Sequence, residues 1–171
     1  MINSINIHKS TINDIDEIFR FYKIATDFQK SKFFVHWPEF KRELIETEIM
    51  KNRQWKMMID GRIACIWATT FSDPQIWGDR DSALYIHRIA TNPDFRGNNL
   101  VAQIVAWAEQ YARENAKEYI RMDTIGENRG LIEYYKKCGF EYLGYFKLDS
   151  IEGLPDHYAL ADACLFEKKL L

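Results

Sequence analysis

The stretch from Tyr85 to Ala112 constrains the fold of this chain more than any other. Its pattern is that of a strand, a tight turn and a long helix, and the turn reads NPDFRGNN over residues 92–99. Such a junction brings free backbone N–H groups, a helix N-terminus and Arg96 to one place, where anions bind well. The stretch therefore predicts an anion site, with an ordinary strand-to-helix connection as the alternative.

The residues of this turn suit close contact with a ligand. Gly97 has no Cβ and lets a ligand approach the backbone. Asn98 and Asn99 tolerate left-handed conformations and can cap the helix that follows, and Arg96 supplies a charged, fork-shaped donor. The turn has neither the Gly-Lys-Ser/Thr ending of a P-loop nor a Gly-x-Gly-x-x-Gly pattern, which argues against both of those nucleotide-binding motifs.

Length and composition limit the class of protein. The 171 residues suit one domain over 1–171, and an apolar share of 47% excludes a disordered chain. The net charge is −2 and the basic residues are scattered, which argues against a nucleic-acid partner. A mildly acidic chain is compatible with an amine substrate without arguing for one.

Cysteine usage points to a reducing compartment, and hydropathy argues against a membrane span. Cys65, Cys138 and Cys164 are far apart, odd in number and form no Cys-x-x-Cys pair, so neither a disulfide framework nor a zinc site is expected. The histidines are isolated as well, and we expect no metal. Without a long apolar run or a signal peptide, the sequence predicts a cytoplasmic protein without a membrane partner.

Periodicity along the chain predicts alternating strands and helices. We expect strands at 4–10, 55–59, 62–71, 84–91, 119–124, 140–148 and 162–169, and helices that start at Thr11 or Asn13, cover about 39–51, start at Leu100 and cover 128–138. Asp60-Gly61 between two apolar runs is a strong hairpin signal. This order predicts an α/β (α+β) protein with a mixed sheet and helices on both faces.

A second region, residues 128–140, also has the composition of a site. It reads NRGLIEYYKKCGF, a helical pattern that Gly139 ends in the position a C-cap prefers. Gly130 costs a helix roughly 1 kcal/mol against alanine, which suggests close packing against the backbone there. Asn128 and Tyr135 are seven residues apart and share one helical face. Tyr135 can donate a proton to a leaving group, or simply pack beside Tyr134.

Together the two regions resemble the GNAT superfamily of CoA-dependent N-acyltransferases. Four features match in order over about residues 84–148: Ile-Ala-Thr followed by Asn-Pro, Phe-Arg-Gly-x-x-Leu at the start of a helix, an Asn seven residues before a Tyr, and Tyr-Lys-Lys-Cys-Gly-Phe. The ending LFEKKL at 165–170 also looks like the family's last strand. The resemblance implies a GNAT-like fold, with a mostly antiparallel sheet of about six or seven strands and about four helices.

The resemblance also implies roles for single residues. Backbone groups of the strand would meet the pantetheine arm of acetyl-CoA, and an amide there could polarise the thioester carbonyl; the residues are Ile89, Ala90 and Thr91. Loop amides would hold the diphosphate, and they belong to Arg96, Gly97, Asn98, Asn99, Leu100 and Val101. Asn128 would contact the CoA arm, and Tyr135 would protonate the leaving thiolate.

Two residues depart from the family's loop, which usually carries small residues at these places. Asn99 stands at the first glycine and accepts a positive φ better than other non-glycine residues. Val101 stands at the last small position, where the backbone must approach the diphosphate. Either its side chain turns into the core or CoA is held more loosely.

The general base and the acceptor are less defined. His87 is a candidate base because histidine titrates near neutrality, and it alternates with Arg88 across the strand. A buried core histidine is the alternative, and Glu46, Glu48 or a water chain are further candidates. By analogy the acceptor would meet the second helix, the Trp77 loop and the turn at 153–158. Five rings could form an aromatic wall for a cation: Trp37, Trp67, Trp77, Tyr85 and Tyr158.

Three functions follow from these features. The first is transfer of an acetyl group from acetyl-CoA to a primary amine by direct attack, the acceptor being a small molecule or a peptide amine. The second is a non-catalytic GNAT-like module that binds CoA or senses a ligand. The third is a scaffold or dimerisation protein with a decayed site, and a homodimer is compatible with all three.

Overall fold

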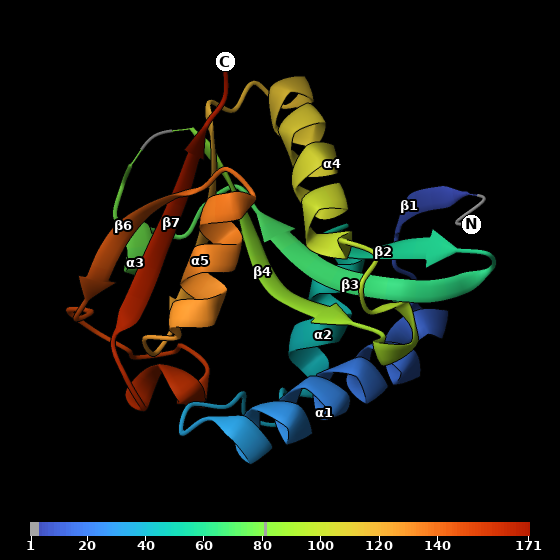
Figure 1. Ribbon diagram of the computed structural model, residues 1–171, viewed down its shortest axis with the longest axis horizontal. Helices are drawn as coiled ribbons and strands as arrows, with labels where there is room; N and C mark the ends of the chain where they lie inside the picture. Colours follow the sequence, from blue (N-terminus) through green and yellow to red (C-terminus); the bar gives the residue numbers. More distant parts are fainter. Residues whose placement is uncertain (1–3, 81) are drawn as a thin grey trace. The chain divides into compact units, whose positions relative to one another are not determined.

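A computed structural model describes residues 4–80 and 82–171 (Figure 1). The described residues form one seven-stranded sheet in the order β1-β2-β3-β4-β5-β7-β6. Its strands are β1 (Ile5–Lys9), β2 (Gln54–Ile59), β3 (Arg62–Thr70), β4 (Ala83–Thr91), β5 (Tyr119–Ile125), β6 (Glu141–Phe146) and β7 (Ala163–Lys169). The α-helices are α1 (Ile15–Lys32), α2 (Arg42–Met50), α3 (Pro74–Trp77), α4 (Leu100–Glu114) and α5 (Arg129–Lys137).

The chain packs as two compact units that divide inside β4. Unit 1 comprises Met1–Thr69 and His87–Leu100, and unit 2 comprises Thr70–Ile86 and Val101–Leu171. Unit 1 therefore holds β1, β2, β3, α1, α2 and the end of β4. Unit 2 holds the start of β4 and the remaining strands, with α3, α5 and nearly all of α4. A single domain over 1–171 stays a prediction.

In unit 1 the predicted hairpin is confirmed. β1 pairs antiparallel with β2, and β2 pairs antiparallel with β3. Asp60 and Gly61 join β2 to β3 with φ values of 49° and 76°. Two consecutive residues with positive φ are what a two-residue hairpin turn of type I′ requires.

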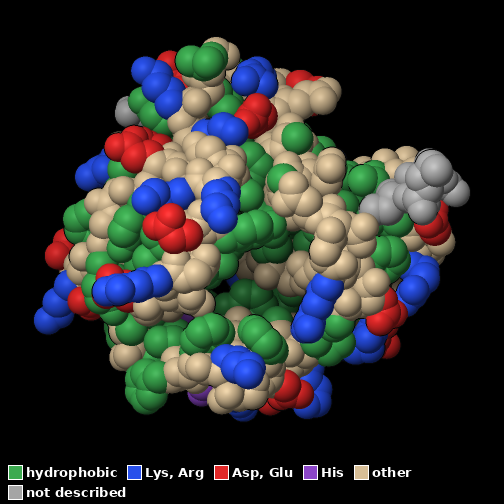
Figure 2. Space-filling view, in the orientation of Figure 1, with side chains coloured by type: hydrophobic (Ala, Val, Ile, Leu, Met, Phe, Trp, Pro, Cys, Tyr) green, Lys and Arg blue, Asp and Glu red, His purple; other side chains and the backbone are tan. Residues whose placement is uncertain are grey.

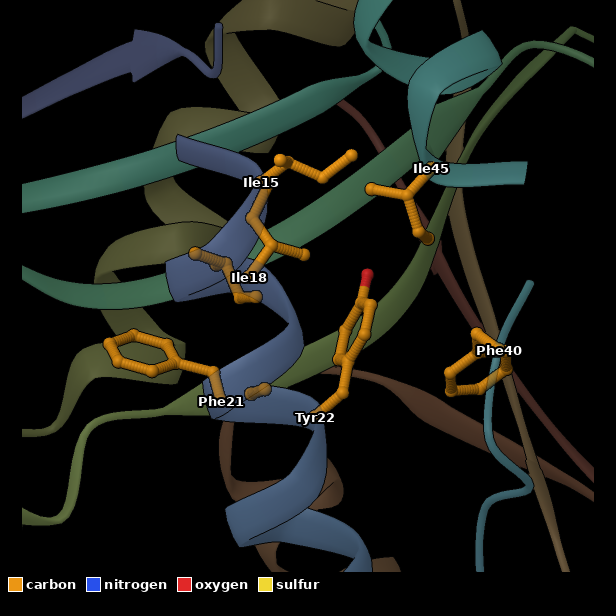
Figure 3. Close-up of a cluster of buried hydrophobic side chains, with 8 residues drawn as sticks. Ile15, Ile18, Phe21, Tyr22, Phe40 and Ile45 are labelled. Carbon is orange, nitrogen blue, oxygen red and sulfur yellow. The ribbon is translucent and has the colours of Figure 1, made fainter. Parts of the chain in front are cut away.

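The core of unit 1 is built from α1 and the segment that leads into α2 (Figure 3). Figure 3 labels six of its buried side chains: Ile15, Ile18, Phe21, Tyr22, Phe40 and Ile45. Helical periodicity over 39–51 predicts that Phe40, Leu44, Ile45 and Ile49 face inward. This prediction is partly wrong, because Leu44 is 37% exposed whereas Glu48 is 7% exposed. A buried carboxylate requires a partner, which Arg88 supplies, as described below.

In unit 2 the last strand of the chain lies between two earlier ones. β4 runs parallel to β5, with Ala83 opposite Tyr119, and β7 pairs antiparallel with both β5 and β6. The mostly antiparallel mixed sheet is thus confirmed. The sequence predicted a loop where the structure has α3, a single turn that starts at Pro74 and buries Ile76 and Trp77.

The helix boundaries of α5 agree with the sequence. Asn128 is its N-cap, and its side chain accepts a hydrogen bond from the N–H of Leu131. Gly139 follows the C-cap with φ at +95°. The capping residues alone therefore account for both ends of α5, without any tertiary contact.

The surface carries charges of both signs. On the face shown in Figure 2, Lys and Arg side chains are interspersed with Asp and Glu, in keeping with the net charge of −2. No helix in the described part of the chain is long and apolar enough to cross a membrane.

Candidate functional site

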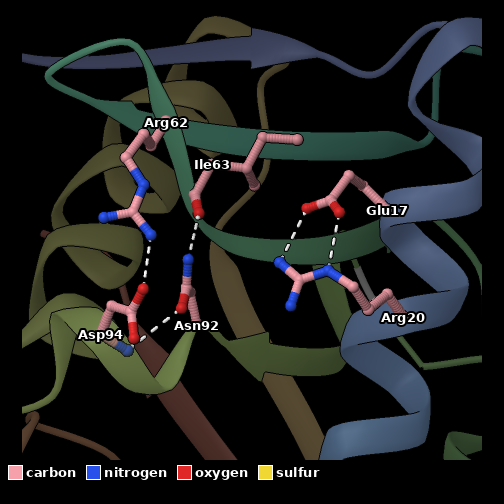
Figure 4. Close-up of polar contacts among 6 residues, drawn as sticks. All are labelled: Glu17, Arg20, Arg62, Ile63, Asn92 and Asp94. Atoms are coloured by element: carbon pink, nitrogen blue, oxygen red, sulfur yellow. Dashed lines mark hydrogen bonds and ion pairs between the residues drawn. The ribbon is translucent and has the colours of Figure 1, made fainter.

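Asn92 fixes the turn that follows β4 (Figure 4). Its Oδ1 accepts a hydrogen bond from the N–H of Asp94 (3.0 Å), and its Nδ2 donates to the carbonyl oxygen of Ile63 (3.1 Å). Its own N–H donates to the carbonyl oxygen of Ala64 at 2.8 Å. Because Asn92 is only 5% exposed, these bonds hold the turn against β3 without competition from water.

The charges around this turn leave it locally positive. Asp94 forms an ion pair with Arg62, whose guanidinium also lies 5.2 Å from the ring centre of Phe95. Arg96 is exposed, and its guanidinium lies 5.9 Å from the ring centre of Phe28 on α1. Since Arg62 neutralises the acid of the turn, the charge of Arg96 is the one that an anion would meet.

Gly97 and Asn99, but not Asn98, take the left-handed backbone conformation that the sequence allows. Gly97 has φ at +82° and Asn99 at +53°. A Cβ at Gly97 would meet nothing within 4 Å, so the conformation and not the space favours glycine there. α4 then begins at Leu100, and the first four N–H groups of a helix have no partner within it. Val101 is partly buried in this first turn, and both readings of its side chain stay open.

Arg88 breaks the regular geometry of β4. Its φ is +50°, a left-handed value inside a strand that costs a residue with a side chain about 1–2 kcal/mol. The prediction that His87 and Arg88 simply alternate between the two faces assumed an extended backbone, and that assumption is wrong here. Ile89, Ala90 and Thr91 follow the kink and complete the strand.

Arg88 is the partner of the buried Glu48. Both carboxylate oxygens of Glu48 accept hydrogen bonds from Nη2 of Arg88, and both side chains are largely buried. The pKa of Arg88 is raised by its neighbours Tyr22 and Glu48, against the opposing effect of burial. Glu48 is therefore engaged and is a poor candidate for a free base. Glu46 is also paired, with Arg42 at 2.9 Å.

His87 does not titrate near neutrality in the folded chain. Burial first, and then the charges of Arg88 and Arg53, lower its pKa to about 3. The ring is consequently neutral near pH 7 and able to accept a hydrogen bond or a proton. A conjugate acid of such low pKa makes it a weak base, so the reason for which the sequence favoured His87 is wrong.

Asn128 and Gly130 begin α5. Asn128 uses Oδ1 as the helix cap, accepting from the N–H of Leu131 at 3.1 Å. A Cβ at Gly130 would meet only Asn128 Oδ1, at 3.5 Å, which is ordinary contact. Close packing by the described part of the protein therefore does not explain this glycine. The predicted contact of Asn128 with CoA stays a prediction.

Tyr135 is built into an aromatic cluster. It is 8% exposed, and its ring centre lies 5.1 Å from that of Phe166 and 6.3 Å from that of Phe140, both edge-on. Tyr134 lies 6.0 Å away. The alternative that Tyr135 packs beside Tyr134 is thus present in the structure. This packing fixes the position of the Tyr135 ring and leaves the role of its hydroxyl as a prediction.

Two rings of the predicted aromatic wall do face a cation, but the cation belongs to the protein. The guanidinium of Arg121 lies 5.0 Å from the ring centre of Trp77 and 5.9 Å from that of Tyr85. Arg121 is 2% exposed and also donates to Glu167 (2.7 Å) and to the hydroxyl of Tyr85 (3.1 Å). The prediction that these rings receive a substrate cation is therefore wrong, and Trp67, at 0% exposure, is core as well.

Unit 2 contains two carboxyl groups with raised pKa values that the sequence did not reveal. Asp73 and Asp123 have carboxylate oxygens within 4.8 Å of each other. Burial, and then the charge of Asp123, raises the pKa of Asp73 to about 7. Burial raises the pKa of Asp123 to about 6, although the hydroxyl of Tyr158 donates to it at 2.7 Å. No sequence pattern links residues so far apart.

The segment between β6 and β7 encloses a hollow of about 580 Å³, lined by residues 147–152 and 158–162. Gln75 on α3 holds the rim of the hollow, because its side-chain Nε2 donates to the carbonyl oxygens of Ser150 (3.0 Å) and Glu152 (2.8 Å). The predicted acceptor turn at 153–158 lies in this segment, and its role stays a prediction.

Comparison with solved structures identifies the fold. A GNAT-family acetyltransferase from Listeria monocytogenes shares 22% identity and a TM-score of 0.76, over 99% of this chain and 98% of that one. The ribosomal-protein-S18-alanine N-acetyltransferase from Escherichia coli shares 11% identity and a TM-score of 0.67, over 98% and 94%. The structure of yncA from Salmonella typhimurium with acetyl-CoA shares 12% identity and a TM-score of 0.68, over 99% of this chain and 95% of that one.

Comparison of sequences identifies the family. The uncharacterised N-acetyltransferase YesJ of Bacillus subtilis is 32% identical over 74 residues, 42% of this chain and 41% of that protein. MJ1207 of Methanocaldococcus jannaschii, also an uncharacterised N-acetyltransferase, is 38% identical over 56 residues, 33% and 25% of the two chains. The match spans less than half the length of these relatives. The family model "Acetyltransferase (GNAT) family" matches residues 20–140. The chain therefore belongs to the GNAT family of acetyltransferases.

Proposed function

We propose that this chain transfers the acetyl group of acetyl-CoA to a primary amine by direct attack. The loop after β4 carries the proposal: Gly97 and Asn99 turn the backbone into the start of α4 beside the exposed Arg96. Backbone N–H groups, the positive end of a helix and a guanidinium suit a diphosphate. Membership of the GNAT family and the acetyl-CoA named with yncA support CoA as the ligand.

The reaction assigns a task to each part of the site. Backbone groups of Ile89, Ala90 and Thr91 align the thioester arm, and an N–H there stabilises the oxyanion. The amine nitrogen attacks the carbonyl carbon, the carbon–sulfur bond breaks, and the thiolate takes the phenolic proton of Tyr135. The proton that the amine loses returns through solvent to the phenolate, so the products are the amide and free CoA thiol.

The base that deprotonates the amine remains a separate question. His87 is neutral near pH 7, but its pKa of about 3 makes it a weak acceptor. The test is the pH–rate profile of His87→Gln. If this profile has the same plateau as that of the wild type, His87 takes no part in the mechanism.

The acceptor is a small-molecule amine or the amine of a peptide. The E. coli structure that shares the fold is named for acetylation of a ribosomal protein alanine, so peptide N-termini belong in a test panel beside small amines. The assay is the release of free CoA thiol from acetyl-CoA with each amine. Turnover with at least one amine is the expected result.

Tyr135→Phe tests the assigned acid. We expect kcat to fall by about 100-fold or more, within the range that a positioned proton donor contributes, while calorimetry shows unchanged CoA binding. Tyr134→Phe is the matched control, because it removes a hydroxyl from the neighbouring ring of the same helix.

The competing function is a module that binds CoA without turnover, which the branched side chain of Val101 at the start of α4 favours. Tight CoA binding with no thiol release on any amine would support that module and contradict the enzyme. Absence of CoA binding in calorimetry would contradict both.

A further inference from the structure

The left-handed backbone at Arg88 requires a cause. A residue with a side chain keeps a φ of +50° inside a strand only where its surroundings determine it. Arg88 stands directly before Ile89, Ala90 and Thr91, the residues whose backbone groups are proposed to align the thioester. Whatever holds Arg88 also decides where those groups point.

The side chain of Arg88 is held from three directions within unit 1. Glu48 on α2 accepts hydrogen bonds from its Nη2 through both carboxylate oxygens. The hydroxyl of Tyr22 on α1 accepts from its Nε at 3.4 Å, and the ring centre of Phe40 lies 5.3 Å from the guanidinium. Gln54 Nε2 donates to the same hydroxyl at 3.1 Å and so orients Tyr22.

The residues that contact the Arg88 side chain are themselves buried in the core of unit 1. Glu48 is 7% exposed, Tyr22 3% and Phe40 6%. Tyr22 and Phe40 belong to the buried cluster of Figure 3, where Tyr22 rises from α1 with its hydroxyl at the far end of the ring. A contact network of this kind has one low-energy geometry and transmits it to the backbone that it grips.

We propose that Glu48 is a positioning residue: by holding the side chain of Arg88 it fixes the left-handed kink in β4 and so directs the N–H and C=O groups of Ile89–Thr91. The inference rests on the proposed function, in which those groups align the acetyl donor. It explains why α2 buries the charged Glu48 while Leu44 on the same helix is 37% exposed.

Glu48→Gln is the first test, because it keeps the shape of the side chain and removes its charge. We expect kcat/KM for acetyl transfer to fall by about 10- to 100-fold, the range that follows displacement of groups that position a substrate. Backbone amide chemical shifts of Ile89–Thr91 should move in the same variant. Asp27→Asn is the control, since it removes one negative charge from an exposed ion pair with Lys23 (2.7 Å) and should change neither.

A glycine rescue separates positioning from mere core stability. Both Glu48→Gln/Arg88→Gly and Glu48→Gln/Arg88→Ala lack the pair, but only glycine adopts a positive φ without steric cost. We expect the glycine variant to keep about tenfold more activity and native-like amide shifts at Ile89–Thr91. A structural role alone predicts the reverse order, because glycine weakens a strand.

The outcomes are distinguishable from a failure of the proposed function. If the wild type turns over no amine, the function is wrong, yet the amide shifts of the same variants still decide whether Glu48 sets the backbone of β4. Unchanged shifts in Glu48→Gln, or equal shifts in the glycine and alanine variants, overturn the proposal. Should Glu48→Gln fail to fold, Tyr22→Phe removes a single contact to Arg88 and must move the same amides.

Discussion

Val101 is the residue at which the loop departs from the small side chain expected at the start of α4. Val101→Ala removes two methyl groups beside the backbone that the diphosphate is proposed to approach. We expect the Kd for CoA to fall by about threefold to tenfold, a gain of up to about 1.4 kcal/mol. Calorimetry measures the Kd.

Val105→Ala is the matched control for Val101→Ala. Val105 lies one turn further along α4 and is 3% exposed, so its truncation should lower stability without changing the Kd for CoA. An unchanged Kd in Val101→Ala would mean that the Val101 side chain already turns into the core, which is the other reading of this residue.

Asp73 should make stability depend on pH. Its pKa of about 7 in the folded chain exceeds the ordinary 3.8, so the folded chain keeps a proton that the unfolded chain releases. The protonated Asp73 therefore contributes to the stability of the folded chain. This contribution is complete at about pH 4 and is lost as the pH rises to about 7. Asp73→Asn cannot ionise, and its stability relative to the wild type should therefore increase between about pH 4 and about pH 8.

Urea midpoints of the two proteins at each pH measure this difference. A constant difference between Asp73→Asn and the wild type across the range would contradict the raised pKa of Asp73.

At the scale of elements, the end of α5 depends on Gly139. Its φ is +95°, and a Cβ there would lie 2.9 Å from Nζ of Lys168 on β7. Gly139→Ala should cost about 1–2 kcal/mol from the backbone alone, and more if Lys168 has to move. Gly153→Ala, at φ +78° with nothing within 4 Å, isolates the backbone cost. A loss at Gly139 no larger than at Gly153 would show that Lys168 moves away freely.

Elements whose signals are local were the ones that the sequence predicted well. The hairpin at Asp60-Gly61 and the capped α5 follow from turn and cap residues, whose preferences act within a few positions. α3 was missed because a single helical turn has no periodicity to detect. Leu44 was placed inside because periodicity cannot foresee that the neighbouring Glu48 finds a buried arginine.

At the scale of the whole molecule, the sequence predicted the order of the strands and of the longer helices and the fold class, but not which distant segments come into contact. Glu48 and Arg88, or Asp73 and Asp123, stand far apart in the chain and meet only through the fold. For the candidate site, the loop at Gly97 and Asn99 was readable from backbone preferences. The pKa of His87 was not, because burial and neighbouring arginines set it.

Phe166 shows how much of unit 2 depends on β7. It is 0% exposed, and its ring centre lies 5.1 Å from that of Tyr135 on α5 and 5.4 Å from that of Tyr142 on β6. Phe166→Ala should lower the free energy of unfolding by about 3–5 kcal/mol. Phe146→Ala, on the exposed end of β6 at 44% exposure, should cost much less. Comparable losses in urea unfolding would contradict this assignment.

The place of β7 between β5 and β6 also sets an order of events during synthesis. β5 and β6 leave the ribosome before the strand that separates them, and each then has an unpaired edge that can join the other in a wrong register. Residues 163–169 must emerge and insert before this half of the sheet closes. Unit 2 therefore completes its fold only after β7 has left the exit tunnel, and a nascent chain that stalls before it is open to misassembly.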